Sequence, residues 1–190
     1  DCLLSRGLGD VYKRQCGVLP AVLVPYFQKR CRDTDKILKA MYVAAGIGQI
    51  IATRSSISGA AGGCQAEIGS ASSMAAGALT YLQGGNCEQI ATSAAMAMKN
   101  LLGLVCDPVA GLVEVPCVKR NVIGTVNAMA CADMAMAGIV SRIPPDQVMD
   151  AMKEVGDKMD ASLRETALGG LAQTEEGMKI AEKMHASYEN

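Results

Sequence analysis

Aromatic side chains are scarce in this sequence of 190 residues: they make up 3% of the chain, which has no Trp and one Phe. Alanine, glycine and methionine take their place, and 50% of the chain is apolar. A chain of this length therefore has the material for one domain with a single buried core. We interpret the 12 methionines as adaptable core filler and not as a methionine metal site.

The sequence also lacks an excess of charge of either sign, with 18 basic and 19 acidic residues and a net charge of -1. It has no long basic run, so it carries no electrostatic signal for binding nucleic acid or an anionic membrane surface. The longest uncharged run, Ile68–Cys87, is rich in Ser, Gly, Gln and Asn. A membrane span needs about 20 mostly apolar residues, so this run predicts a buried helix with its turn.

A secretory start is missing as well, and the cysteines lie far apart in a chain that is too large to need disulfide staples. We therefore expect a protein of the reducing cytoplasm. Residues 1–15 share neither the small-residue composition nor the helical apolar period of the rest. We interpret them as a non-native leader, which leaves residues 16–190 for the fold, and we assign no role to Cys2.

Apolar residues recur at helical spacing along the remainder, and no segment shows the alternation typical of strands. Asp33 or Thr34 is a suitable N-cap for the second helix, and Asn86 with Gln89 for the fourth. The helix at 65–82 has small residues on every side, so we expect it to be central and surrounded by the others. The pattern as a whole predicts an all-α fold, with helices at about 17–30, 35–53, 65–82, 87–101, 119–141, 146–159 and 174–187.

The cysteines fall into two groups by their surroundings. Cys64 lies at the start of the 65–82 helix, where free backbone N–H groups and the helix dipole favour a thiolate. Cys106 and Cys117 lie on the loop GLVCDPVAGLVEVPC at 103–117. The others lie within or beside apolar helical faces, and we interpret them as core residues: Cys16, Cys31, Cys87 and Cys131.

Three loop-associated cysteines do not match structural zinc sites or electron-transfer clusters, which use four ligands at short spacing. They match a metal that keeps one position open for a substrate, where it acts as a Lewis acid. The residues alone leave the identity of such a metal open.

Four segments carry a resemblance to a known family: CGVLPAVLVPY, SSISGAAGGCQAEIGSASSMAAGAL, GLVCDPVAGLVEVPCVKRN and LRETALGGLAQT. Together they resemble the C-terminal part of the α chain of iron–sulfur-dependent L-serine dehydratase, from about Cys16 through Thr174. The likeness is closest to the two-chain type, in which a separate β chain accompanies the α chain. Because the family's α chain begins earlier, the resemblance implies that residues 16–190 are a C-terminal fragment of its catalytic domain.

The resemblance implies a [4Fe–4S] cluster that is held by Cys64, Cys106 and Cys117, with no fourth protein ligand. It implies dehydration of L-serine to pyruvate and ammonia without pyridoxal phosphate, with the open iron acting on the serine hydroxyl. The implied partners are the β chain and a higher oligomer of α and β chains. We expect the fragment alone to be inactive, because its base is expected from the missing N-terminal half or from the β chain.

Other polar residues near these motifs have two interpretations each. Glu67 is a general acid or base, or else a carboxylate that serves as a cap partner at its helix start. Asp107 is expected as a turn former before a proline. Lys119 and Arg120 attract the serine carboxylate or the cluster, or else lie exposed at a helix start. His185 lies in the polar tail and is not expected to be the base.

Two other functions stay open. The first is a different lyase on the same scaffold, such as a cysteine desulfidase or a dehydratase of another β-hydroxy amino acid. The second is a metal-binding subunit without turnover of its own. For a shared cluster, the three sulfurs are expected to meet at the N-terminal end of the 65–82 helix.

Overall fold

The computed structural model describes residues 17–112 and 115–188. Every regular element within these ranges is a helix, which confirms the predicted all-α fold. Strand-type pairing there is limited to one isolated bridge, between Cys106 and Arg164. The expected leader with Cys2, and also Cys16, lie outside the described residues. No helix in the described part is long and apolar enough to cross a membrane.

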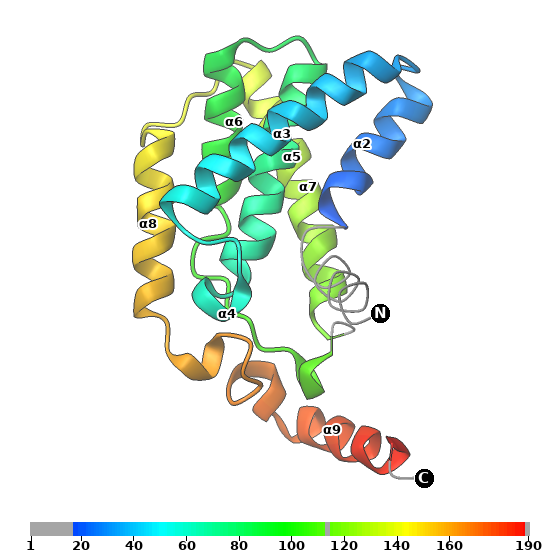
Figure 1. Cartoon of the computed structure of the whole chain (residues 1–190), viewed down its shortest axis with the longest axis vertical. Coiled ribbons are helices and arrows are strands. Elements are labelled where there is room, and N and C mark those ends of the chain that lie inside the picture. The colour runs from blue at the N-terminus through cyan, green and yellow to red at the C-terminus, as the bar shows by residue number, and fades with distance from the viewer. Residues whose placement is uncertain (1–16, 113–114, 189–190) are drawn as a thin grey trace.

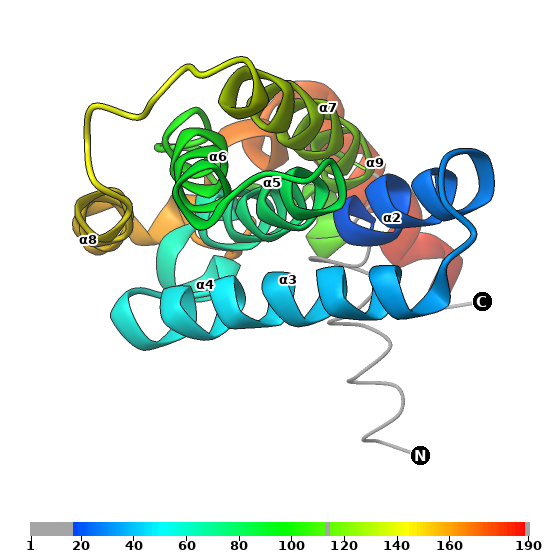
Figure 2. The same ribbon diagram turned by 90° about the horizontal axis from the view of Figure 1, so that it is seen from above.

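The centre of the molecule is a helical rod made of two consecutive elements, the π-helix η1 (Gln65–Gly69) and helix α5 (Ser70–Leu82). Nearly all of its residues are buried, which confirms the expectation of a central helix at 65–82. The π-helical turn itself was not predicted, and such turns are frequent at functional sites. Figures 1 and 2 show the rod enclosed by four helices: α2 (Val18–Lys29), α3 (Thr34–Arg54), α6 (Cys87–Lys99) and α7 (Cys117–Met136).

Small side chains allow the helices to approach this rod closely. A Cβ atom at Gly77 of α5 would lie 2.2 Å from Cδ1 of Ile47 on α3, so a larger residue would push that side chain away. The hydroxyl of Ser72 donates to the carbonyl of Gly124 on α7 over 2.8 Å. A buried serine is therefore tolerated in the centre, because its hydroxyl has a backbone partner.

Capping residues begin two helices as predicted. The carboxylate of Asp33 accepts a hydrogen bond from the backbone N–H of Lys36 in the first turn of α3. Asn86 and Gln89 form a reciprocal capping box at the start of α6. These local side-chain bonds satisfy N–H groups that have no partner within the helix, which explains why the sequence alone locates these starts.

Helix α7 differs from the prediction of a helix at 119–141. It begins at Cys117 and ends at Met136. Gly138 has a φ of 84°, a left-handed conformation that ends helices, so the chain leaves the helix before residue 141. The residues beyond it form the connection to helix α8 (Pro145–Lys158), which packs against α6.

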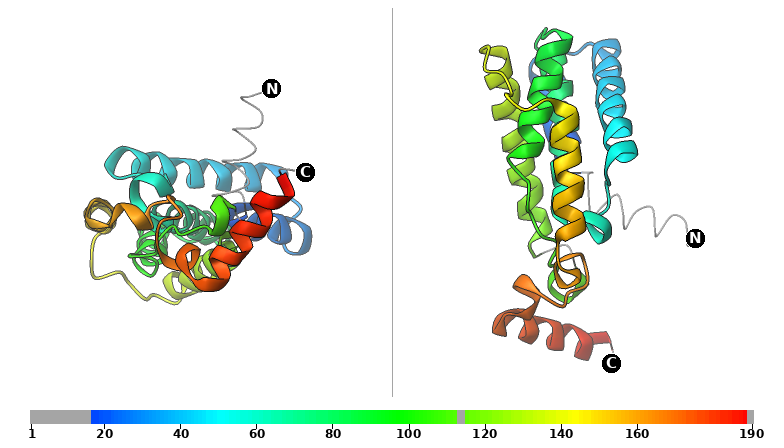
Figure 3. Two further views of the ribbon diagram at one scale, coloured as in Figure 1. Left: turned by 90° about the horizontal axis from the view of Figure 1, so that it is seen from below. Right: turned by 90° about the vertical axis from the view of Figure 1, so that its left-hand side faces the viewer.

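One end of the bundle, the lower end in Figure 1, is built from short elements that apolar periodicity did not predict. Helix α9 follows them, at the position predicted for the last helix, and Figure 3 shows it crossing below the bundle. The cysteine motifs meet at this end of the bundle. The elements of this end are α4 (Gly59–Gly62), η2 (Val109–Gly111), η3 (Ala161–Leu163), η4 (Gly170–Gln173) and α9 (Glu175–Tyr188).

The predicted core residues are confirmed in part. Cys131 is buried as expected, whereas Cys31 is half-buried and Cys87 is exposed. The assignment of Cys87 to the core is therefore wrong, because it is the first residue of α6 and its side chain faces solvent. Met129 is also exposed, while the methionines that do fill the core are Met96, Met98, Met149 and Met152.

Candidate active site

Cys64 lies in a tight turn between α4 and the central rod. The preceding Gly63 has a φ of 73°, and a Cβ atom there would lie 2.9 Å from the carbonyl oxygen of Leu104. That carbonyl accepts a hydrogen bond of 2.9 Å from the N–H of Gln65. The turn thus brings Cys64 directly against the segment that leads to the second cysteine.

Cys106 is held in an extended segment by backbone hydrogen bonds. Its N–H donates to the carbonyl of Leu163, and its own carbonyl accepts from the N–H of Glu165, each over 2.8 Å. The partner segment comes after α8, more than fifty residues later in the chain. The region at 161–173 therefore positions the middle cysteine, a role that no sequence signal indicated.

Cys117 is the first residue of α7 and not a residue of the loop, which corrects its predicted place. The loop before it is closed by a 3.0 Å hydrogen bond from the N–H of Val109 to the carbonyl of Val115. The helix start thus gives Cys117 a regular backbone, while the closed loop returns the chain toward Cys106.

Two of the three predicted ligands, Cys64 and Cys106, meet beside Glu67 at the N-terminal end of the central rod. Sulfur atoms of Cys64 and Cys106 and a carboxylate oxygen of Glu67 all lie within 4.8 Å of one another. The Cys64 thiol also forms hydrogen bonds with the thiols of Cys106 and Cys117. All three cysteines are buried. Cys117 lies next to Cys64 but is not one of the three residues whose ligand atoms all lie within 4.8 Å of one another.

The thiols of Cys64 and Cys117 have raised pKa values in the metal-free protein. A hydrogen bond to Cys106, followed by burial, raises the pKa of the Cys64 thiol to about 12, although the hydrogen bond from Cys117 acts in the opposite direction. The hydrogen bond to Cys64 and burial also raise the pKa of Cys117. In the metal-free protein the pKa of Cys64 thus lies above its ordinary value, and not below it as the helix start led us to expect.

Glu67 lies beside the thiols and is buried. Its Oε1 atom accepts a 2.8 Å hydrogen bond from the N–H of Gly59, at the start of α4. A Cβ atom at Gly59 would lie 2.3 Å from this oxygen and 3.2 Å from the sulfur of Cys106. Glu67 therefore caps a neighbouring helix, and the lack of a side chain at Gly59 makes room for it.

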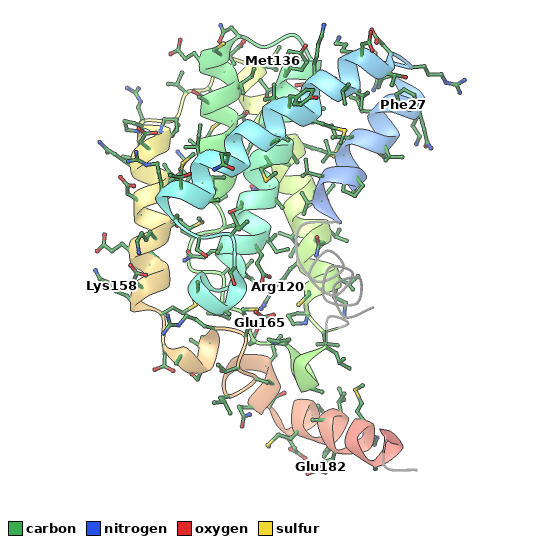
Figure 4. All side chains as sticks on the ribbon, viewed as in Figure 1. Phe27, Arg120, Met136, Lys158, Glu165 and Glu182 are labelled. Atoms are coloured by element: carbon green, nitrogen blue, oxygen red, sulfur yellow. The ribbon has the colours of Figure 1, made fainter. Side chains whose placement is uncertain are left out.

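Asp107 and Arg120 form a buried ion pair next to the thiols, with 2.7 Å between Oδ1 and Nη1. The second carboxylate oxygen of Asp107 accepts from the N–H of Leu171 over 2.8 Å. The expectations of a simple turn former and of an exposed helix start are therefore wrong for these two residues. Lys119, by contrast, is exposed, as expected for a residue at a helix start. Figure 4 shows Arg120 and Glu165 together at the lower end of the bundle.

Gln65 is a structural residue of the site that the sequence interpretation missed. Its amide nitrogen donates to the carbonyl of Met152 on α8, and its amide oxygen accepts from the N–H of Gly103. One buried side chain thereby connects the central rod, α8 and the loop of the second cysteine. Its place directly after Cys64 in the GCQ motif is the signal that would have identified it.

Known proteins match most of this chain. A family model described as serine dehydratase alpha chain matches residues 15–172. The probable L-serine dehydratase α chain of Bacillus subtilis is 53% identical over 168 residues, which cover 88% of this chain and 56% of that protein. The corresponding protein of Latilactobacillus sakei is 53% identical over 164 residues, 86% of this chain and 78% of that one. The L-serine dehydratase α chain of Peptoniphilus asaccharolyticus is 49% identical over 164 residues, 86% of this chain and 56% of that one.

Proposed function

Because the chain belongs to the serine dehydratase α-chain family, we propose that it is the metal-binding part of a lyase that converts L-serine to pyruvate and ammonia. The chain spans 56% of the length of two of the relatives named above, so the activity is assigned to the complete enzyme. The observation that carries the proposal is the meeting of the buried thiols of Cys64 and Cys106 beside the carboxylate of Glu67, with the buried thiol of Cys117 next to Cys64.

The donor set fits a [4Fe–4S] cluster held by Cys64, Cys106 and Cys117. Soft thiolate ligands suit iron–sulfur clusters, and three thiols leave one iron without a cysteine. When bound, such a cluster supplies a Lewis acid that makes the serine hydroxyl a better leaving group. The thiols must lose their protons on binding, so the raised pKa values of Cys64 and Cys117 make loading dependent on pH.

Glu67 is proposed to exchange protons with the substrate. Dehydration removes a proton from Cα and adds one to the departing hydroxyl, so the site needs groups that accept and donate protons. The Glu67 carboxylate lies within 4.8 Å of two of the sulfurs, and the N–H of Gly59 holds its Oε1 in place. A base for the Cα proton is proposed to come from the remainder of the α chain or from a β chain.

A larger assembly with a β chain is proposed for the active enzyme. Several relatives are named α chains, as expected for one component of a multi-chain enzyme. Helix α7 also presents an exposed apolar stripe at helical spacing, formed by Val118, Val122, Val126 and Met129. Contiguous exposed apolar surface of this kind is typical of a face that other protein covers.

The cysteines of the described residues are all free thiols, which supports a reducing compartment, the cytoplasm.

The test is anaerobic purification of the complete α chain with its β chain, followed by iron and sulfide analysis and assays of pyruvate formation from L-serine. We expect a bound cluster and turnover, both lost on Cys106→Ala, and loss of turnover with retention of the cluster on Glu67→Gln. Residues 1–190 alone are expected to bind the cluster without turnover. Metal-free enzyme with full turnover would refute the proposal.

Two outcomes of the same assay would favour the other functions. Faster release of sulfide and pyruvate from L-cysteine than of pyruvate from L-serine would indicate a desulfidase. A bound cluster without turnover of either substrate by the complete α and β chains would indicate a metal-binding subunit. Each outcome contradicts the serine dehydratase proposal in a different way.

A further inference from the structure

The guanidinium group of Arg120 lies where the three cysteine-bearing segments meet. Its Nη1 atom donates to the Asp107 carboxylate over 2.7 Å, to the carbonyl of Val105 over 2.8 Å and to the sulfur of Cys64 over 3.6 Å. Val105 and Asp107 are the two sequence neighbours of Cys106. Arg120 itself lies in the first turn of α7, which begins with Cys117.

We propose that Arg120 is a positioning residue for the three thiols, and that it stabilises their negative charge when they hold the cluster. This inference rests on the proposed function. Its side chain is 13% exposed, so its charge acts in a largely desolvated environment. An arginine keeps its charge at all working pH values, and its Nη1 atom shares its two N–H groups among the three acceptors.

Asp107 fixes the guanidinium in this orientation. One carboxylate oxygen bonds to Arg120, and the other accepts from the N–H of Leu171. A Cβ atom at Gly170 would lie 2.4 Å from that second oxygen, so the backbone at 170–171 packs directly against the carboxylate. The carboxylate is thus held from both sides, and Arg120 has little freedom to turn away from Cys64.

The contact between Arg120 and Cys64 becomes stronger when the thiols lose their protons. When the cluster binds, the three thiols release their protons to solvent and their sulfurs become thiolate ligands. The hydrogen bond from Arg120 to Cys64 then joins a cation to a negatively charged sulfur, and hydrogen bonds with an ionised partner are the stronger ones. Hydrogen bonds to the sulfurs and net charge are among the factors that set the reduction potential of a cluster, so Arg120 should raise this potential.

The experiment compares Arg120→Met with wild type in the full chain of 190 residues, after reconstitution with iron and sulfide under argon. Measured quantities are iron per chain, the midpoint potential of the cluster and the rate at which its absorption is lost in air. We expect a downward shift of the potential and a several-fold faster loss for Arg120→Met. Arg120→Lys keeps the charge but places it on a shorter, flexible side chain that is less well held beside Cys64, so its potential should lie between the other two.

Lys119→Met is the matched control, because it removes one positive charge from an exposed neighbouring residue of the same helix turn. It should leave the potential unchanged. If Arg120→Met does not fold by circular dichroism, the double variant Asp107→Asn/Arg120→Met removes the unpaired carboxylate and serves in its place.

Two results would overturn the inference. An unchanged potential in the Arg120 variants that fold, or an equal shift in Lys119→Met, would overturn it alone. Absence of iron from wild type, in this chain and in the complete enzyme, would overturn the proposed function and this inference together.

Discussion

Two buried cysteines of this chain, Cys131 and Cys64, have very different neighbours. Cys131 lies within α7 in an apolar cluster rich in alanine, and its sulfur contacts the side-chain amides of Asn100 and Asn127. Cys64 lies at the start of the central rod, where its sulfur meets two further thiols and the guanidinium of Arg120. Cys131 therefore packs among helices of the bundle, whereas Cys64 contacts residues from segments that are distant in the sequence.

The comparison shows that burial of a cysteine does not by itself make a metal site. Burial is the main cause that raises the pKa of the Cys131 thiol to about 11. For Cys64 the main cause is the hydrogen bond to Cys106, and the pKa rises to about 12. Both thiols are therefore unreactive in the metal-free protein, but only the group around Cys64 offers several sulfur donors that exchange protons for metal together.

Removing one thiol from each environment should give the largest contrast. We expect Cys106→Ala to lose the cluster, because one of its three cysteine ligands is removed. Cys131→Ala should retain the cluster and cost about 1 kcal/mol of unfolding free energy, as expected for a small core cavity. Iron analysis and denaturant unfolding of both variants measure these effects. A cluster that survives Cys106→Ala but not Cys131→Ala would reverse the comparison.

Gln65 tests whether the thiol site depends on contacts between distant segments. Gln65→Ala removes the hydrogen bonds to Met152 and Gly103, and we expect a loss of about 2 kcal/mol of unfolding free energy from the backbone groups left unpaired. Gln49→Ala on the exposed side of α3 is the control and should change stability by less than about 0.5 kcal/mol. Equal unfolding midpoints for the two variants would contradict this role of Gln65.

Local signals made much of the fold predictable from the sequence. Capping by Asn86 and Gln89 depends on residues three apart, and the central place of the 65–82 segment follows from its small side chains. The three cysteines could be selected as ligands through the resemblance of their motifs. The expectation that these cysteines lie close together also came from the resemblance, because helical periodicity does not indicate which loops are neighbours.

Contacts between distant segments account for what was not predicted. Asp107 precedes a proline, which is typical of a turn, yet its partners are Arg120 and the N–H of Leu171. The supporting segment at 161–173 has short 3₁₀ turns that carry no apolar period. Such residues are recognisable only when the fold has brought the segments together.

Two glycines offer a smaller test of the same comparison. Gly59→Ala places a methyl group 2.3 Å from the Glu67 carboxylate and should cost about 1–2 kcal/mol of unfolding free energy while displacing that carboxylate. Gly46→Ala on α3 meets no atom within 4 Å and should stabilise the helix by about 0.5–1 kcal/mol. Thermal unfolding measures both variants, and the unfolding midpoint should fall for Gly59→Ala and rise for Gly46→Ala. The same sign for both would show that the close approach at Gly59 does not constrain the site.

A further effect is expected in the stability of the metal-free protein at alkaline pH. The folded state raises the thiol pKa of Cys64 from 9.0 to about 12 and that of Cys131 from 9.0 to about 11. Above pH 9.0 the unfolded chain loses these protons while the folded chain keeps them, so stability falls as pH rises toward the folded values. Below pH 9.0 both states hold the protons, and the contribution is constant. Cys131→Ala should flatten the alkaline part of the curve by removing one such thiol, and Cys64→Ser should flatten it further toward higher pH. Denaturant midpoints measured across this range, under reducing conditions and without metal, provide the comparison, and curves parallel to wild type in both variants would contradict it.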